Sequence, residues 1–314
     1  MKTFLKIAIG CLVAPIVIGV VLIIVALTLR KTSPPQHREE AANLEQSVAG
    51  VTEAQLASEG LEPGKAAPMG RPLPVGIVLE EGNFTIEAGP AGSSIRVEGD
   101  YDAGAYELKQ ELAKDGSGQP HYTLSFRSRR SMFHRLLTEG GVHIDKNDNR
   151  ISIFLPRGIP IALDARIRIG TSHLNLGGLA LSNASLDLSM GEHTITVAEL
   201  NPLEMSNLTM NLAMGEWRLG DIGNLRAGNI EMWGKMGTAH FDFGEKLARD
   251  TRLTARMRMG ELDLHVPPDA RVKASTSAFL GDSSGKLPAD ENANGFLLEV
   301  DSSIKLGEVK YRRN

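Results

Sequence analysis

A glycine recurs at nearly constant spacing through the second half of the chain. Gly170, Gly191, Gly215, Gly237 and Gly260 are separated by 21, 24, 22 and 23 residues. On both sides of each glycine apolar and polar side chains alternate, and a period of two is typical of strands with one buried face. A repeat of about 22 residues that holds two strands and a glycine bend predicts stacked coils, each contacting its neighbours. We therefore predict an all-β fold, a β-solenoid-like stack of two-strand repeats, clearest over residues 161–270.

Methionine precedes four of these five glycines. The four are Met190, Met214, Met236 and Met259. Because each continues the apolar alternation of the preceding strand, we expect the methionines to form one ladder in the interior of the stack. The alternative is that a row of flexible methionines makes an adaptable binding surface.

The outward positions support this alignment of the repeats. The residues four before the glycines are Arg166, Asp187, Asn211, Trp233 and Arg256. Stacking would place Arg166 beside Asp187, a complementary pair, and Trp233 beside Arg256, which suits a cation–π contact.

The flanking regions also have the character of strands. Residues 73–160 contain several alternating runs separated by turn signals, and we expect them to form the first layers of the same stack. The tail from residue 295 to 314 is expected to add two closing strands. The β-domain is thus predicted to span residues 73–314. The high glycine count, 33 of 314 residues, and the 5% of aromatic residues suit many tight turns and thin layers.

The first 72 residues have a different composition. Residues 7–29 are uncharged and mostly apolar, and as a helix of about 35 Å they would cross a hydrocarbon core of about 30 Å. We predict a transmembrane anchor over residues 1–30 that contacts the lipid bilayer through residues 7–29. Residues 31–72 contain no Phe, Tyr, Trp or Ile, so we expect a flexible tether. Flanking charges nearly balance, and since long domains translocate largely regardless of charge, we expect a single-pass cell-membrane protein with its C-terminal domain extracytoplasmic.

Composition excludes several functional classes. The net charge of −4 argues against nucleic-acid binding, which usually needs a basic excess. One cysteine permits no intrachain disulfide. The eight histidines lack metal-site spacing, and the protease-like fragment at 281–285 lacks a supported triad. We therefore expect that the protein is not an enzyme, and we predict no catalytic residue, cofactor or metal site.

One segment, residues 125–141, is unlike the rest. Arg129, Arg130 and Arg135 alternate there with apolar residues such as Phe133. If residues 128–138 form a helix, one face is apolar and the remainder basic, which is typical of a membrane-surface contact. The alternative is a helix that covers the end of the stack with its arginines in solvent.

The run NRISIFLPRGIPIALDARIRIG, the glycine-punctuated strands after it, and MGELDLHVPPDARVKASTSAFLGDSS resemble a known family. They are similar to bacterial DUF4097-type adhesin, or toast-rack, domains, such as the C-terminal domains of LiaF- and PspC-like cell-envelope proteins. The resemblance covers about residues 75–310. It implies a stress-sensing or scaffold role near the membrane and supplies no functional residues to transfer.

These observations favour a non-enzymatic, membrane-anchored interaction or scaffold/sensor module of the cell envelope. We expect an envelope protein or polymer as partner, bound at Trp233, Lys235, Arg256 and Arg258; the oligomeric state is left open. The alternative is a lipid-transfer protein in which the Leu and Met rows line an open β-groove.

Overall fold

The structure is a computed structural model that describes residues 46–48, 71–129, 149–284 and 293–313. The predicted anchor at residues 7–29, nearly all of the predicted tether and the segment 130–148 lie outside the described residues. Within the described ranges the helical element is the short 3-10 helix η1 (Ile222–Leu225), and no helix there is long and apolar enough to cross a membrane.

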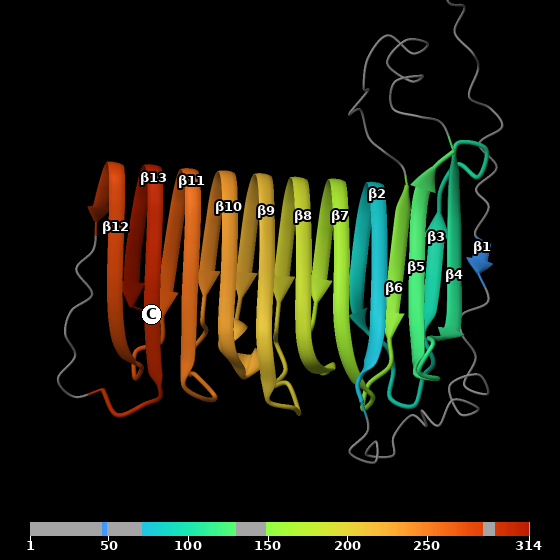
Figure 1. The fold of residues 1–314 in the computed structure, drawn as a ribbon, viewed down its shortest axis with the longest axis horizontal. Helices are drawn as coiled ribbons and strands as arrows, with labels where there is room; N and C mark the ends of the chain where they lie inside the picture. The colour runs from blue at the N-terminus through green and yellow to red at the C-terminus, as the bar shows by residue number, and fades with distance from the viewer. Residues whose placement is uncertain (1–45, 49–70, 130–148, 285–292, 314) are drawn as a thin grey trace, which may run out of the picture. The chain divides into compact units, whose positions relative to one another are not determined.

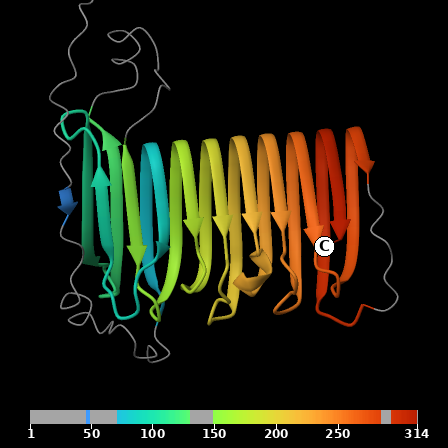
Figure 2. The same ribbon diagram turned by 180° about the vertical axis from the view of Figure 1, so that it is seen from behind.

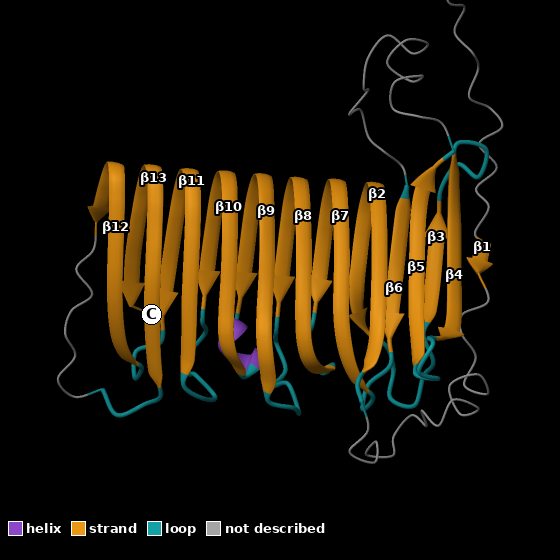
Figure 3. Ribbon diagram, in the orientation of Figure 1, coloured by secondary structure: helices purple, strands orange, loops and turns teal. Residues whose placement is uncertain are grey.

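The described residues form one β-rich unit, which confirms the all-β prediction (Figures 1 and 3). Its strands are β1 (Gln46–Val48), β2 (Leu73–Ala88), β3 (Arg96–Asp100), β4 (Tyr106–Lys114), β5 (Pro120–Ser128), β6 (Arg150–Leu155), β7 (Pro160–Asn175), β8 (Ala180–Thr196), β9 (Met205–Gly220), β10 (Ala227–Asp242), β11 (Thr251–Val266), β12 (Arg271–Ser284) and β13 (Leu297–Arg313). They pair in the order β1-β3-β6-β2-β7-β8-β9-β10-β11-β13-β12, and β4 joins through β5, which pairs with β2.

Each repeat is one long strand that folds over at its glycine. The neighbouring strands from β7 to β11 are parallel, and Gly170, Gly191, Gly215, Gly237 and Gly260 pair in register along the stack. The predicted stacking and alignment are therefore confirmed, although each repeat is a single bent strand of 16 or 17 residues rather than two separate strands. The strands fold over along one edge of the unit, which we call the bend edge, and loops join them at the opposite edge (Figures 1 and 2).

The core lies between the two halves of the bent strands. In β9, Leu208, Met210 and Leu212 are buried before the bend, and Trp217 and Leu219 are buried after it. The alternation therefore changes phase at the glycine, and both halves direct their apolar side chains inward. A lipid groove would require the Leu and Met rows to line an open channel, but the leucine rows fill a closed core in the described coils.

The glycine is required because a Cβ at the bend would point into the backbone of the neighbouring coil. Gly215 has a φ of +146°, a region that residues with a Cβ rarely adopt. A Cβ added there would overlap the carbonyl oxygen of Gly191, and the same overlap with the neighbouring coil recurs along the column. Three glycines that the repeat analysis did not align, Gly82, Gly281 and Gly307, belong to this column.

Both ends of the stack depart from simple succession. The first half of β2 pairs with β5 and its second half pairs with β6, so two separate strands occupy the place of one bent strand. At the other end β13 lies between β11 and β12. The tail was predicted to form two strands, but it forms one strand bent at Gly307, because that glycine allows the ladder to continue around the corner.

We expect Gly215→Ala to lower the free energy of unfolding by at least about 3 kcal/mol, because the methyl group meets both a positive φ and a neighbouring backbone oxygen. Denaturant unfolding of the full chain, followed by circular dichroism, measures the change.

Gly116→Ala is the matched control, because a Cβ there meets nothing within 4 Å. Equal stability of the two variants would contradict the account of the glycine column.

Candidate functional site

Exposed apolar side chains line the bend edge, which corrects the expectation of an interior methionine ladder. The exposed fractions are 43% for Met190, 45% for Met214, 42% for Met236 and 41% for Met259. Neither of the two residues before each of these glycines is buried, so the inward–outward alternation ends one residue early and the methionine lies at the corner instead of between the two halves. The period of two in the sequence predicts burial correctly up to this position and fails at the bend.

Two further strands extend this row. Leu306 of β13 and Leu280 of β12 occupy the same position and are 42% and 60% exposed. We call the six residues the apolar crest: Met190, Met214, Met236, Met259, Leu306 and Leu280. Because adjacent strands lie about 4.8 Å apart, the crest is a straight row of about 24 Å. It does not extend to β7, where the equivalent residue Ile169 is only partly exposed, and in β2 the equivalent residue is the buried Glu81, which accepts a hydrogen bond from Tyr106 Oη.

Cations lie directly beside the crest on the side that precedes the bend. Lys235, Arg258 and Lys305 each come immediately before a crest residue and are exposed. None of the three forms an ion pair with another described residue. We call these three residues the basic flank.

Acidic side chains lie on the other side of the crest, directly after the glycines. Glu216 pairs with Arg218, and Lys310 pairs with Glu261 at 2.7 Å and with Glu308 at 3.2 Å. Hydrogen bonds to Glu261 and then Glu308 raise the pKa of Lys310. Lys310 thus shares one positive charge between two glutamates, and the exposed Glu192 forms no ion pair with another described residue, so this side keeps a negative charge, opposite to that of the basic flank.

The residues predicted to bind a partner lie on the outer surface of β10 and β11, before the bend. Trp233 is opposite Arg256 in the register, as expected, and is 43% exposed. Arg256 donates hydrogen bonds from both terminal nitrogens to Asp301, which raise the pKa of Arg256 and lower that of Asp301. Lys235 and Arg258 belong to the basic flank.

The residues predicted to contact a membrane surface are mostly not described. Arg129 is exposed at the end of β5, and Arg130, Phe133 and Arg135 lie outside the described residues. The predicted helix at 128–138 stays a prediction.

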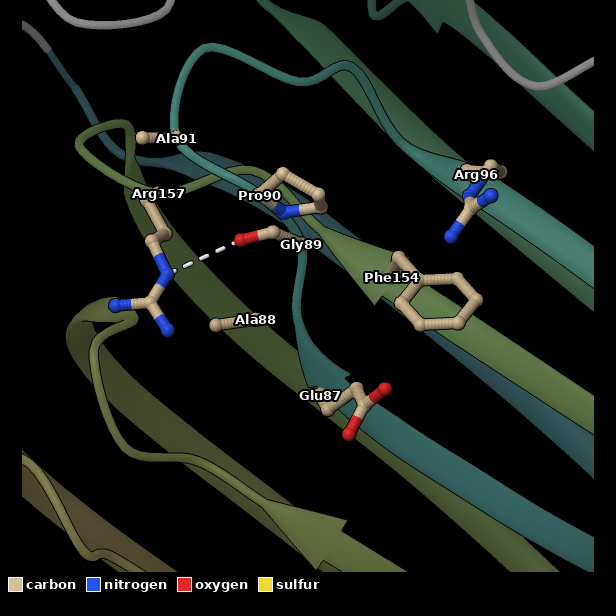
Figure 4. Close-up of a pocket in the computed structure, with 8 residues that line it drawn as sticks. All are labelled: Glu87, Ala88, Gly89, Pro90, Ala91, Arg96, Phe154 and Arg157. Carbon is tan, nitrogen blue, oxygen red and sulfur yellow. Dashed lines mark hydrogen bonds between the residues drawn. The ribbon is translucent and has the colours of Figure 1, made fainter.

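A shallow hollow of about 480 Å³ lies between the turn after β2 and the end of β6 (Figure 4). Arg157 Nε donates to the carbonyl of Gly89 at 3.0 Å (Figure 4). The terminal nitrogens of Arg157 donate to the carboxylate of Glu199. Arg96 stacks on Phe154 at 4.3 Å and pairs with Glu98 at 2.8 Å. Both guanidinium groups are therefore engaged by the protein itself, and the hollow offers neither of them free to a ligand.

A polar cluster lies on the outer surface after the bend. The Oδ2 atom of Asp263 is 3.5 Å from His240 Nδ1, 3.3 Å from His265 Nε2 and 3.5 Å from Arg312. Asp263 is buried beneath these groups. No three His, Cys, Asp or Glu side chains within the described ranges are arranged to hold a metal ion.

Sequence reasoning missed a buried Ser–His pair. Ser172 Oγ lies 2.8 Å from His193 Nδ1, and the two residues are 0% and 1% exposed. Burial lowers the pKa of His193 to about 4. The pair is sealed between the two halves of the stack, where it cannot meet a substrate, so it contributes to structure. Its signal was a polar residue at an inward position of the alternation.

Comparisons with known proteins place few constraints on function. No family model matches the chain, and no curated protein matches it. A candidate cell adhesion protein from Clostridium sporogenes superposes with a TM-score of 0.38 at 13% identity, covering 81% of this chain and 96% of that chain. A candidate adhesin from Bacteroides fragilis superposes with a TM-score of 0.36 at 13% identity, covering 77% and 93%. TM-scores this low do not establish a shared fold.

We expect the buried His193 to make stability depend on pH. Between about pH 4 and pH 6.5 this histidine is protonated in the unfolded chain and neutral in the folded protein, so stability rises with pH across this window. Its full contribution is on the order of 3 kcal/mol, and it is lost as the pH falls through the window.

Urea unfolding of the full chain at several pH values between 4.5 and 7 tests this expectation. His193→Leu removes the titrating group, so the difference between wild type and variant isolates its effect from those of other groups. Parallel pH profiles for the two proteins would contradict it.

Proposed function

We propose that the chain is a non-enzymatic, membrane-tethered interaction module of the cell envelope, which binds a large partner along the bend edge. The observation that carries this proposal is the apolar crest, six side chains in register that are each at least two-fifths exposed. Burying apolar area of this kind is favourable, and contiguous exposed apolar patches usually mark interaction sites.

The mode of binding follows from the architecture. The interior is filled, and the arginines of the hollow in Figure 4 are engaged with protein groups. A stack of identical corners instead offers the same contact once per coil, which supports shallow binding at many points. Weak single contacts add up along the row, so binding needs the length of the stack.

The proposed localisation and the proposed class of protein are supported by the sequence. The apolar stretch at residues 7–29 supports a single-pass anchor in the cell membrane with the β-domain on the extracytoplasmic side. The adhesin-like, scaffold or sensor role follows the sequence resemblance to envelope proteins.

The proposal predicts which edge of the β-rich unit contacts the partner when the full chain is present in the cell. A photo-cross-linking benzophenone amino acid at Met214 or Met236 of the full chain should form several-fold more macromolecular adducts than the same group at Glu245 or Lys246. The latter two are exposed in the loop after β10, at the opposite edge.

Mass spectrometry of the adducts, formed in cells that express the full chain, gives both their yield and their chemical class. Lipid, protein and polymer adducts all count as contacts of the crest. Equal yields at the two edges would contradict the proposed site.

A further inference from the structure

We infer that the apolar crest and the basic flank together bind an anionic lipid surface. This inference names the partner of the proposed interaction site and rests on that proposed function. Three features of the bend edge support it: its shape, its charge and the place where the segment 130–148 is attached.

The crest has the shape of a ridge. Each strand folds over at its glycine, so the crest side chains stand on a convex edge and form a row one side chain wide. A stable protein–protein interface usually buries about 800 Å² on each partner and needs matched surfaces. A fluid bilayer interface accepts a narrow apolar ridge without any matched surface, and flexible methionine side chains adapt to it.

The charges beside the crest are complementary to lipid phosphates on one side only. Lys235, Arg258 and Lys305 form no ion pair with described residues, so their charge is available to a ligand. On the opposite side, Glu261 and Glu308 are held by Lys310. The lipid surface therefore meets the crest and the basic flank, and the acidic side faces away from it.

The bend edge also carries both ends of the segment 130–148. The backbone N–H of Ser128 donates to Glu80 Oε2 at 2.8 Å, and Asn83 N–H donates to the carbonyl of Asn149 at 2.8 Å. The sequence between them interleaves arginines with apolar residues, the composition expected near anionic lipid.

The test measures contact between the crest and lipid in the full chain. In a Cys11→Ser background, a single cysteine replaces Met236 and carries an environment-sensitive fluorophore. The protein is reconstituted into vesicles of phosphatidylcholine, with or without phosphatidylglycerol, that contain a lipid-borne quencher. We expect strong quenching with phosphatidylglycerol, weaker quenching without it, and none from the same label at Glu245.

Two pairs of variants distinguish the contribution of the basic flank from that of the crest methionines. In these variants the fluorophore is attached to a cysteine that replaces Leu306. Charge reversal of Lys235, Arg258 and Lys305 should greatly reduce quenching, because each cation is worth about fivefold in partition to an anionic surface. Charge reversal of Lys109 and Lys114 on β4 and of Lys246 in the loop after β10 changes the net charge by the same amount outside the basic flank, and it should leave quenching unchanged. Replacing the four crest methionines by glutamine should abolish quenching, and replacing them by leucine should preserve it.

Absence of quenching at Met236 in phosphatidylglycerol vesicles overturns the inference, as does equal loss in the flank variant and its control. If quenching is absent but cross-links at the crest join it to a protein or polymer, the lipid inference fails and the interaction module stands. If neither quenching nor cross-links occur, both fail.

Discussion

The close approach of neighbouring backbones at the glycine column is the constraint on which the rest of the structure depends. A Cβ at Gly215 would occupy the place of the Gly191 carbonyl oxygen, so the coils stack only where glycines align. That alignment fixes the register of every strand around it, and a one-residue slip would turn the buried side chains outward. Each position of the repeat therefore becomes a row, and the crest is the row that lies at the corner.

The chain reverses direction at both edges of the unit, but it does so by different means. Along the bend edge every bent strand turns at a glycine, whereas at the opposite edge loops of different lengths accommodate the variation in repeat length. There the buried Asn201 donates to the carbonyls of Leu181 and Leu225 and accepts from the N–H groups of Leu181 and Leu203. One side chain thus satisfies backbone groups on neighbouring coils that have no ladder partners.

The period of two in the sequence predicted the strands and their alignment, because burial of one face requires apolar and polar residues to alternate along a strand. It failed where the chain changes direction. Met214 continues the apolar alternation, but a backbone with positive φ at Gly215 places it at the corner. The insertion of β13 between β11 and β12 could not be predicted from the sequence either, because the order of strands in a sheet depends on contacts between residues distant in sequence. The Ser172–His193 pair could have been expected from two polar residues at inward positions.

The position of β13 has a consequence for how the protein is made. Among the described residues β12 pairs with β13 alone, and β13 in turn covers β11. During synthesis β12 leaves the ribosome before the strand that it needs, so it cannot join the stack when it emerges. The coils up to β11 can assemble as they appear, but the end of the stack closes only after β13 has been released, and a chain interrupted before Leu297 would keep the edge of β11 open to other strands.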